Sequence, residues 1–231
     1  MEIIYTSIAT IYSNLYCTDK GSEPLMKTKR RIGIIGGTFN PIHLGHLLIA
    51  EIAQEAFHLE KVIFVPAHIP PHKDKDVISA THRFAMTEAA VADNPHFEIS
   101  DVEMKRAGPS YTIDTIHYFI DEYGADVDFY FIAGTDTILD LPSWKYIDEL
   151  LQICHFIGAS RPDSVKPIDT VLDYFGSIGK EKIHLLQVPE IKLSATYLRE
   201  RLRQGKTVRY MLPKCVVDYI DQSNIYTEEE D

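Results

Sequence analysis

The sequence predicts an α/β fold, an open doubly wound parallel sheet in a single domain. Short strands rich in Ile, Val, Phe and Tyr alternate with helical stretches along most of the chain, which is the pattern of successive βαβ units. The length of 231 residues suits one sizeable α/β domain. Glycine turns and polar segments follow several of the strands, as expected where a parallel sheet presents its carboxyl edge to a ligand.

The first strand and the helix after it surround a glycine turn. An apolar run predicts a strand over 32–36, and an amphipathic run predicts a helix over 43–57. Between them stands Gly36-Gly37-Thr38-Phe39-Asn40-Pro41-Ile42-His43-Leu44-Gly45-His46. A strand, a glycine turn and a helix in this order form a common scaffold for phosphates, because the amides and the dipole of a helix N-terminus favour negative charge. The two histidines, three residues apart, are expected on one face of the helix start.

The remaining elements continue the alternation. We expect further strands, each short and rich in β-branched or aromatic residues, over 62–66, 97–103, 128–133, 155–159 and 183–188. Helical periodicity indicates helices over 80–92, 111–123, 145–152, 167–177, 195–204 and 213–223. Ser110 and Ser194 are candidate N-caps, and Pro213 suits a first helical turn. This order implies parallel strands joined by right-handed crossovers.

Composition excludes several classes of function. The formal net charge of −11 disfavours a nucleic-acid partner, which normally meets a basic surface. The three cysteines, Cys17, Cys154 and Cys215, are far apart, which fits a reducing, cytoplasmic environment. No apolar stretch reaches the roughly 20 residues of a membrane span, so no membrane partner is expected. Residues 1–30 lack the features of a secretory signal. We interpret them as an N-terminal extension, which need not be ordered, before a domain that spans residues 31–231.

Four segments that follow predicted strands contain polar residues. They are Gly36-Gly37-Thr38, Pro66-Ala67-His68-Ile69-Pro70-Pro71-His72-Lys73, Gly134-Thr135-Asp136 and Pro189-Glu190-Ile191-Lys192-Leu193-Ser194. The carboxyl ends of parallel strands meet at one edge, so these segments are expected to converge on one site.

The glycine spacing excludes two common phosphate motifs. The dinucleotide fingerprint requires GxGxxG, and this chain has Gly33 followed by Gly36 and Gly37. The phosphate loop requires a glycine five residues before GK[ST], and Glu200 occupies that position before Gly205-Lys206-Thr207.

Each candidate residue also has a purely structural interpretation. His43 and His46 are alternatively helix-capping or core histidines, although two of them beside a glycine turn favour phosphate binding. The two histidines are a further candidate for a pair of metal ligands, but the motif lacks the HExxH glutamate and no third ligand is evident. Trp144, the only tryptophan, is alternatively a core residue, as a lone tryptophan more often is, but its polar neighbours suit a partly exposed, stacking ring. Ser194, Thr196 and Arg199 place hydroxyls and a guanidinium at a helix start, a second candidate anion site.

The chain resembles the nucleotidylyltransferase superfamily through the segment from Gly36 to His46. Further motifs make it similar to the bacterial nicotinate mononucleotide adenylyltransferases of that superfamily. These motifs are Ile69-Pro70-Pro71-His72-Lys73, Gly108-Pro109-Ser110-Tyr111-Thr112-x-Asp114-Thr115, Leu141-Pro142-x-Trp144 and Leu193-Ser194-Ala195-Thr196-x-x-Arg199. The resemblance runs from about residue 31 to the C-terminus and implies a Rossmann-like nucleotidyltransferase fold.

The resemblance also implies a reaction, in which ATP and nicotinate mononucleotide give deamido-NAD and pyrophosphate with Mg²⁺. It implies catalytic contacts from His43, His46 and Arg199. The residues implied to bind ATP are Gly36, Gly37, Thr38, Phe39, Gly134, Asp136, Ser194 and Thr196. Those implied to bind nicotinate mononucleotide are Lys73, Thr112 and Trp144. No residue is implied to hold a metal by itself.

Two departures from the family pattern are present. Ala195 replaces a serine of the usual Ser-Ser-Thr, and Asn40 replaces an aspartate that often follows the phenylalanine. The alternatives are a sister transferase with phosphopantetheine, glycerol phosphate or nicotinamide mononucleotide as acceptor, and a non-catalytic nucleotide-binding regulator. A class I synthetase shares a similar histidine motif, but the chain is too short for a tRNA-binding domain. The sequence does not predict the oligomeric state or the choice between nicotinate and nicotinamide.

Overall fold

A computed structural model describes residues 29–69, 76–124, 126–160, 168–189 and 191–227. Its centre is a six-stranded sheet in which every pairing is parallel. The strands are β1 (Arg30–Gly37), β2 (Lys61–Pro66), β3 (Phe97–Ile99), β4 (Val127–Gly134), β5 (Cys154–Ser160) and β6 (Ile183–Gln187). Most of the predicted N-terminal extension lies outside the described residues.

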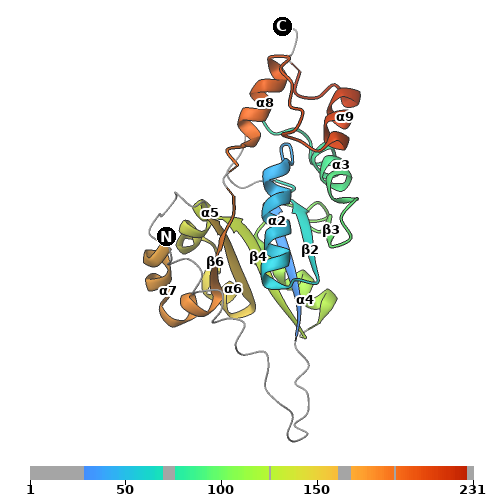
Figure 1. Ribbon diagram of the computed structural model, residues 1–231. Coiled ribbons are helices and arrows are strands. Elements are labelled where there is room, and N and C mark those ends of the chain that lie inside the picture. Colours follow the sequence, from blue (N-terminus) through green and yellow to red (C-terminus); the bar gives the residue numbers. More distant parts are fainter. Residues whose placement is uncertain (1–28, 70–75, 125, 161–167, 190, 228–231) are drawn as a thin grey trace, which may run out of the picture.

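Helices connect the strands and extend beyond the last one (Figure 1). They are α2 (Leu44–Phe57), α3 (Ala80–Val91), α4 (Thr112–Tyr123), α5 (Thr135–Leu139), the 3-10 turn η1 (Leu141–Ser143), α6 (Ile147–Ile153), α7 (Ile168–Lys182), α8 (Ala195–Arg203) and α9 (Lys214–Ser223). Among the helices of the described ranges, none is both long and apolar enough to cross a membrane.

The strand order is β3-β2-β1-β4-β5-β6, which confirms the predicted open, doubly wound sheet. The chain leaves β1 in one direction to β2 and β3, then returns to the other side of β1 to start β4. This reversal places a topological switch point between β1 and β4, and ligands of such sheets bind beyond the carboxyl ends of the strands there.

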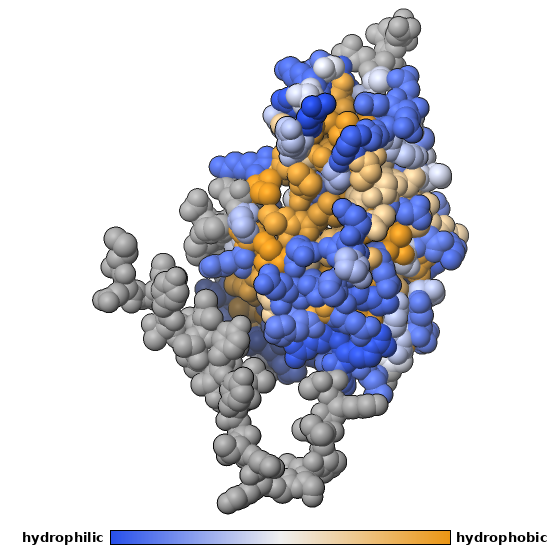
Figure 2. Space-filling view, turned by 45° about the vertical axis from the view of Figure 1, so that its right-hand side comes forward, coloured by the Kyte–Doolittle hydropathy of each residue, from blue (hydrophilic) through white to orange (hydrophobic). Residues whose placement is uncertain are grey.

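Each face of the sheet carries its own core because successive side chains in a strand point to opposite faces. Within β4, Tyr130 and Ile132 pack with helices α2, α3, α8 and α9, whereas Phe129 and Phe131 pack with α4, α5, α6 and α7. In Figure 1 helix α2 crosses in front of the sheet, and α3, α8 and α9 lie together at one end. Figure 2 shows exposed apolar residues in the middle of one face, between polar surfaces above and below.

The structure corrects some predicted boundaries. Strand β3 ends at Ile99 rather than at residue 103, and the chain turns over residues 102–105. Helix α7 continues to Lys182, and Gly176 interrupts it with a φ of 62°. The short elements α5 and η1 were not predicted. Ser194 caps α8 as expected by accepting a hydrogen bond from Tyr197 N.

The predicted N-cap at Ser110 is wrong. Tyr111 is the N-cap residue of α4, and it makes no side-chain capping hydrogen bond. The Ser110 hydroxyl is instead buried without a hydrogen-bond partner in the described part of the chain.

Candidate active site

Two adjoining cavities lie at the carboxyl edge of the sheet. The first, of about 360 Å³, is lined by the ends of β1 and β4, the starts of α2 and α4, and the segments after β3 and η1. Its lining residues include Gly36, Gly37, Thr38, His46, Glu103, Ser110, Thr112, Gly134, Thr137 and Trp144. The second, of about 300 Å³, is lined by Thr38, Phe39, Asn40, His46, Val77, Ala195, Thr196 and Arg199. Both cavities share Thr38 and His46, which belong to the turn after β1 and the start of α2. We call the first cavity, which contains Trp144, the aromatic end of the site, and the second, which contains Arg199, the cationic end.

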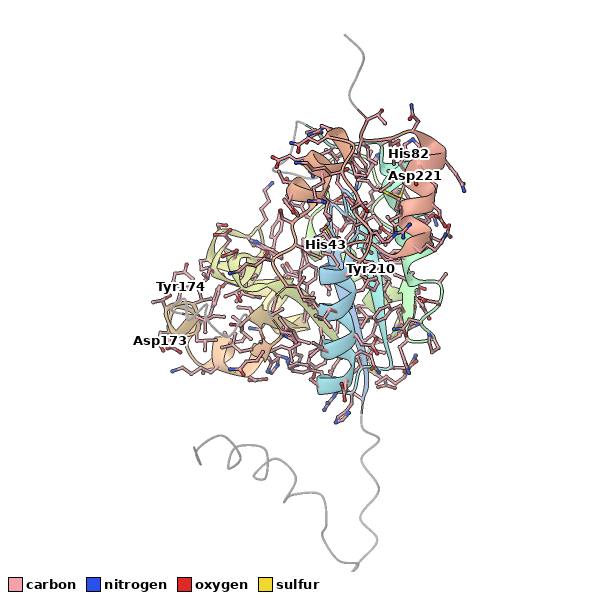
Figure 3. The ribbon with its side chains drawn as sticks, turned by 45° about the horizontal axis from the view of Figure 1, so that its top comes forward. His43, His82, Asp173, Tyr174, Tyr210 and Asp221 are labelled. Carbon is pink, nitrogen blue, oxygen red and sulfur yellow. The ribbon has the colours of Figure 1, made fainter. Side chains whose placement is uncertain are left out.

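The two histidines lie at the start of α2. His43 is the N-cap residue and its backbone N–H donates to His46 Nδ1 at 3.2 Å, while the two rings stack with centroids 3.7 Å apart. His46 lines both cavities, whereas His43 is only 6% exposed. Burial lowers the pKa of His43 to about 4, so this imidazole is neutral at pH 7. Figure 3 shows His43 at the end of α2 that points toward α8 and α9.

Gly45 leaves room for the buried His43 ring. A Cβ atom at this position would lie 3.0 Å from His43 Nδ1 and 3.1 Å from Cε1, closer than a side chain normally tolerates. Phe39, at a φ of 48°, packs edge-on against the His46 ring with centroids 5.2 Å apart. Each of the two histidine rings is therefore held by packing as well as by the helix cap.

Asn40 connects the turn after β1 to three other segments. Its Nδ2 donates to the Asp76 carbonyl at 2.7 Å, and its Oδ1 accepts from the Tyr226 hydroxyl at 2.6 Å. Its own carbonyl accepts from Arg199 Nη1 at 2.9 Å. Asn40 is 3% exposed, and a buried amide with all these groups paired fixes the geometry of the turn.

Arg199 is held on two sides at the cationic end. Besides its bond to Asn40, its Nε donates to Asp76 Oδ2 at 2.8 Å, and Arg203 pairs with the other Asp76 oxygen. Burial acts to raise the pKa of Asp76, but the hydrogen bonds and charges of both arginines outweigh it and lower that pKa. The guanidinium of Arg199 is thus held in one orientation at the wall of the second cavity.

A buried arginine lies beneath the cationic end. Arg83, 1% exposed, donates to the carbonyls of Ile78, Thr38 and His68 at 3.2, 2.8 and 3.0 Å. These bonds join α3 to the segments that follow β1 and β2. The Arg83 guanidinium also places a buried positive charge next to the Thr38 carbonyl.

Trp144 and Glu103 distinguish the aromatic end. The Trp144 ring is partly buried and packs edge-on against Phe131 and Phe156, with centroids 5.7 and 6.2 Å away. The partly exposed ring expected from the sequence is confirmed, and Trp144 also borders a further cavity of about 760 Å³. Glu103, 8% exposed, lies in the wall of the first cavity and accepts from Thr115 Oγ1 at 2.7 Å.

The structure brings most of the sequence-predicted site residues to these two cavities. Ser194 serves as the α8 cap, and Asp136 is exposed at the start of α5, outside the residues that line the cavities. Lys73 lies outside the described residues.

Sequence reasoning missed four residues that shape the site, namely Asp76, Arg83, Glu103 and Tyr226. Glu103 had a usable signal, because it ended the predicted strand 97–103 and so belonged at the carboxyl edge of the sheet. The other three act through contacts distant in sequence, such as the one between Asn40 and Tyr226, which are 186 residues apart.

Comparison with known proteins identifies the class. The cytidylyltransferase-like family model matches residues 34–201, which include both ends of the site. The chain belongs to this family.

Relatives within the family are close in sequence. The probable nicotinate-nucleotide adenylyltransferase of Moorella thermoacetica is 46% identical over 198 residues, covering 85% of this chain and 91% of the relative. The protein of the same name from Thermoanaerobacter sp. is 43% identical over 208 residues, with 89% and 99% covered.

Solved structures agree on the fold. Plasmodium falciparum nicotinic acid mononucleotide adenylyltransferase, in complex with NaAD, superposes with a TM-score of 0.70 at 22% identity, covering 85% of this chain and 97% of that one.

Proposed function

We propose that this chain is a nicotinate-nucleotide adenylyltransferase, which transfers AMP from ATP to nicotinate mononucleotide and releases pyrophosphate. One observation supports this activity most strongly. The cavity walled by Trp144 and the cavity walled by Arg199 meet at Thr38 and His46, as a site needs when it joins an aromatic acceptor to a triphosphate donor. The names of the sequence relatives support the same acceptor.

The phosphate of nicotinate mononucleotide attacks the α-phosphate of ATP in line, a P–O bond forms, and the bond to the leaving pyrophosphate breaks. The acceptor phosphate is already an anionic nucleophile, so this reaction needs no protein nucleophile or base. Catalysis then depends on positioning and on stabilising the charge that develops on the transferring phosphoryl group.

The cationic end is assigned to ATP. His46 donates Nε2–H to a phosphate oxygen, and Arg199 and Thr196 bind the triphosphate from the α8 side. His43 acts mainly by supporting His46, since it is buried and neutral. The backbone groups and side chains assigned to the remaining ATP contacts are those of Gly36, Gly37, Thr38, Phe39, Gly134, Asp136 and Ser194.

The aromatic end is assigned to nicotinate mononucleotide. Trp144 stacks on the pyridine ring and Thr112, at the start of α4, contacts the ring substituent. Lys73 is assigned to the mononucleotide phosphate. Ala195 lacks a hydroxyl that the family motif usually offers, and the Ser194 and Thr196 hydroxyls supply the α8 contacts without it.

Mg²⁺ is proposed as the accompanying metal ion. In the part of the chain that the structure describes, no group of three or more His, Cys, Asp or Glu side chains could hold a metal ion. Mg²⁺ commonly binds substrate phosphates, keeps several waters and uses few protein ligands, so this donor set fits an ion held mainly by ATP. Such an ion neutralises phosphate charge.

The domain is proposed to span residues 31–231. A cytoplasmic location is proposed because the reaction consumes ATP and because Cys154 and Cys215 are unpaired thiols.

An acceptor panel tests the proposal. Pyrophosphate release from ATP is measured with nicotinate mononucleotide, nicotinamide mononucleotide and phosphopantetheine under identical conditions. The highest kcat/KM is expected with nicotinate mononucleotide. A higher kcat/KM with phosphopantetheine would assign the chain to a sister transferase, and binding of ATP without any turnover would make it a regulator.

A further inference from the structure

We propose that Glu103 is a specificity residue of the acceptor pocket, a carboxylate that pairs with the positive charge of the oxidised pyridine ring. In a pyridine mononucleotide the ring nitrogen bonds to ribose, so the oxidised ring is a pyridinium cation. Pairing of this cation with Glu103 rests on the proposed function, because it requires that Trp144 and its surroundings receive the ring.

The position of Glu103 points toward a ligand. It lies in the turn after β3, is 8% exposed, and contributes to the wall of the same cavity as Trp144, Thr112 and Ser110. A carboxylate is rarely buried without a partner of opposite charge, because taking it out of water is costly. The neutral Thr115 hydroxyl donates a hydrogen bond to its carboxyl group.

A second polar group in this wall is incompletely paired. The Ser110 hydroxyl is buried and makes no hydrogen bond of normal geometry with the described residues, although it is near enough to the Glu103 carboxyl to act on its pKa. A carboxyl group and an incompletely paired hydroxyl in the wall of one cavity indicate a polar ligand rather than a closed structural network.

The nearby cation does not pair directly with Glu103. Arg106 Nη2 donates to Thr115 Oγ1 at 2.8 Å, and its Nη1 lies 3.6 Å from Asp114 Oδ2. Thr115 therefore stands between the Arg106 guanidinium and the Glu103 carboxyl, accepting from one and donating to the other. This arrangement orients the carboxyl group. It also leaves the carboxyl group able to pair with a cationic ligand that enters the cavity.

The chemistry of the pocket suits a cationic aromatic ring. The face of a tryptophan attracts cations, and a carboxylate in a partly dry cavity attracts them more strongly than it would in water. Trp144 and Glu103 together therefore favour the pyridinium ring over its uncharged, reduced dihydropyridine form. The carboxyl and phosphate groups of the acceptor are the same in both forms.

The protonation of Glu103 offers an additional readout. Burial raises the pKa of Glu103, with Asp114 acting in the same direction and the Thr115 and Ser110 hydroxyls and Arg106 opposing. Binding of a cation favours the ionised carboxylate, so the affinity for the oxidised acceptor is expected to fall as the pH falls through the Glu103 pKa. His46 is the other titratable side chain that lines this cavity in the described ranges.

The test uses the intrinsic fluorescence of Trp144, the only tryptophan of the chain, to measure binding without turnover. Dissociation constants are determined for nicotinate mononucleotide and for its reduced form. We expect wild type to prefer the oxidised form by about tenfold or more, and Glu103→Gln to lose most of this preference. Glutamine retains the acceptor for the Thr115 hydroxyl. Asp101→Asn is the matched control, since Asp101 is an exposed carboxylate two residues away that pairs with Lys105, and its preference should equal that of wild type.

Two results would overturn the assignment of Glu103. One is an unchanged preference for the oxidised acceptor in Glu103→Gln. The other is equal affinity of the wild-type protein for the oxidised and the reduced acceptor, a measurement that does not depend on the folding of any variant. Failure of the proposed function would look different, as an absence of pyrophosphate release from ATP and nicotinate mononucleotide in the wild-type protein.

Discussion

The two histidines at the start of α2 have different electrostatic environments. His46 Nδ1 accepts the His43 backbone N–H, so the neutral ring carries its hydrogen on Nε2 and can donate it to a phosphate. His43 is kept neutral by burial and stacks beneath His46. In the proposed site, His46 therefore donates a hydrogen bond to the ligand and His43 supports its ring.

Replacement of His46 separates capping from phosphate contact. Glutamine three residues after an N-cap can return a hydrogen bond to the N-cap amide, so His46→Gln preserves the helix start but removes the imidazole donor. We expect kcat to fall by about 10²-fold or more in both His46→Gln and His46→Ala. Only the alanine variant should also lose stability, by about 1 kcal/mol.

Steady-state kinetics and urea unfolding of the two variants provide the check. Recovery of near wild-type kcat in His46→Gln would mean that His46 is a capping residue and not a phosphate ligand.

At the scale of elements, the C-terminal segment stabilises the turn after β1. Tyr226 follows α9 and donates its hydroxyl to Asn40, which also accepts from Arg199 of α8. The Arg199 guanidinium and the Tyr226 hydroxyl therefore both bind Asn40, in the turn that borders the two cavities. Burial raises the pKa of Tyr226, so this hydroxyl keeps its proton at neutral pH.

Tyr226→Phe removes this single hydroxyl. We expect a loss of about 1 kcal/mol in unfolding free energy and a rise of about threefold in KM for ATP, because the turn that is proposed to hold the triphosphate loses a hydrogen bond. Tyr219→Phe is the control, since the Tyr219 hydroxyl contacts His82 Nδ1 at 3.0 Å between α9 and α3, away from the turn. An equal change of KM in both variants would contradict a specific role for Tyr226.

A histidine pair joins β5, β6 and the end of α7. His155 Nδ1 lies 3.0 Å from His184 Nε2, and Lys182 Nζ lies 3.3 Å from His155 Nε2. The lysine is a donor, so His155 Nε2 accepts and its Nδ1–H donates to His184. Burial first, and then the charge of Lys182, lower the pKa of His155 to about 4.

This pair predicts acid sensitivity. A histidine with a folded-state pKa below its unfolded value of about 6.5 contributes stability that is complete above that value and is lost as the pH falls toward 4. After allowance for screening by water, His155 should account for about 1–2 kcal/mol. Urea unfolding at pH 7.5 and pH 5 measures the loss, and His155→Gln should show a smaller one. An equal loss in the variant would assign acid sensitivity to other groups such as His43.

For the whole molecule, local patterns predicted the elements and their order well. The short apolar strands and the glycine turn sufficed to place Gly36, Thr38 and His46 at the carboxyl edge of a parallel sheet, and the strand order confirms this placement. They did not predict α5 and η1, which are five and three residues long, too short for periodicity to register.

Long-range polar contacts were beyond sequence reasoning. The burial of Arg83 depends on three carbonyls from separate segments, and Asp76 meets two arginines more than 120 residues away. Neither residue belongs to a recognisable motif, since what defines each of them is a set of partners that only the folded sheet brings together.

The proposed function requires that the two adjoining cavities bind ATP and nicotinate mononucleotide, and that AMP passes from the first substrate to the second. Quantifying deamido-NAD and pyrophosphate together, from the purified chain with ATP, Mg²⁺ and nicotinate mononucleotide, tests it most directly. We expect both products to form in equal amounts and only when both substrates are present. Pyrophosphate without the dinucleotide, or no turnover at saturating substrates, would contradict the proposed adenylyl transfer.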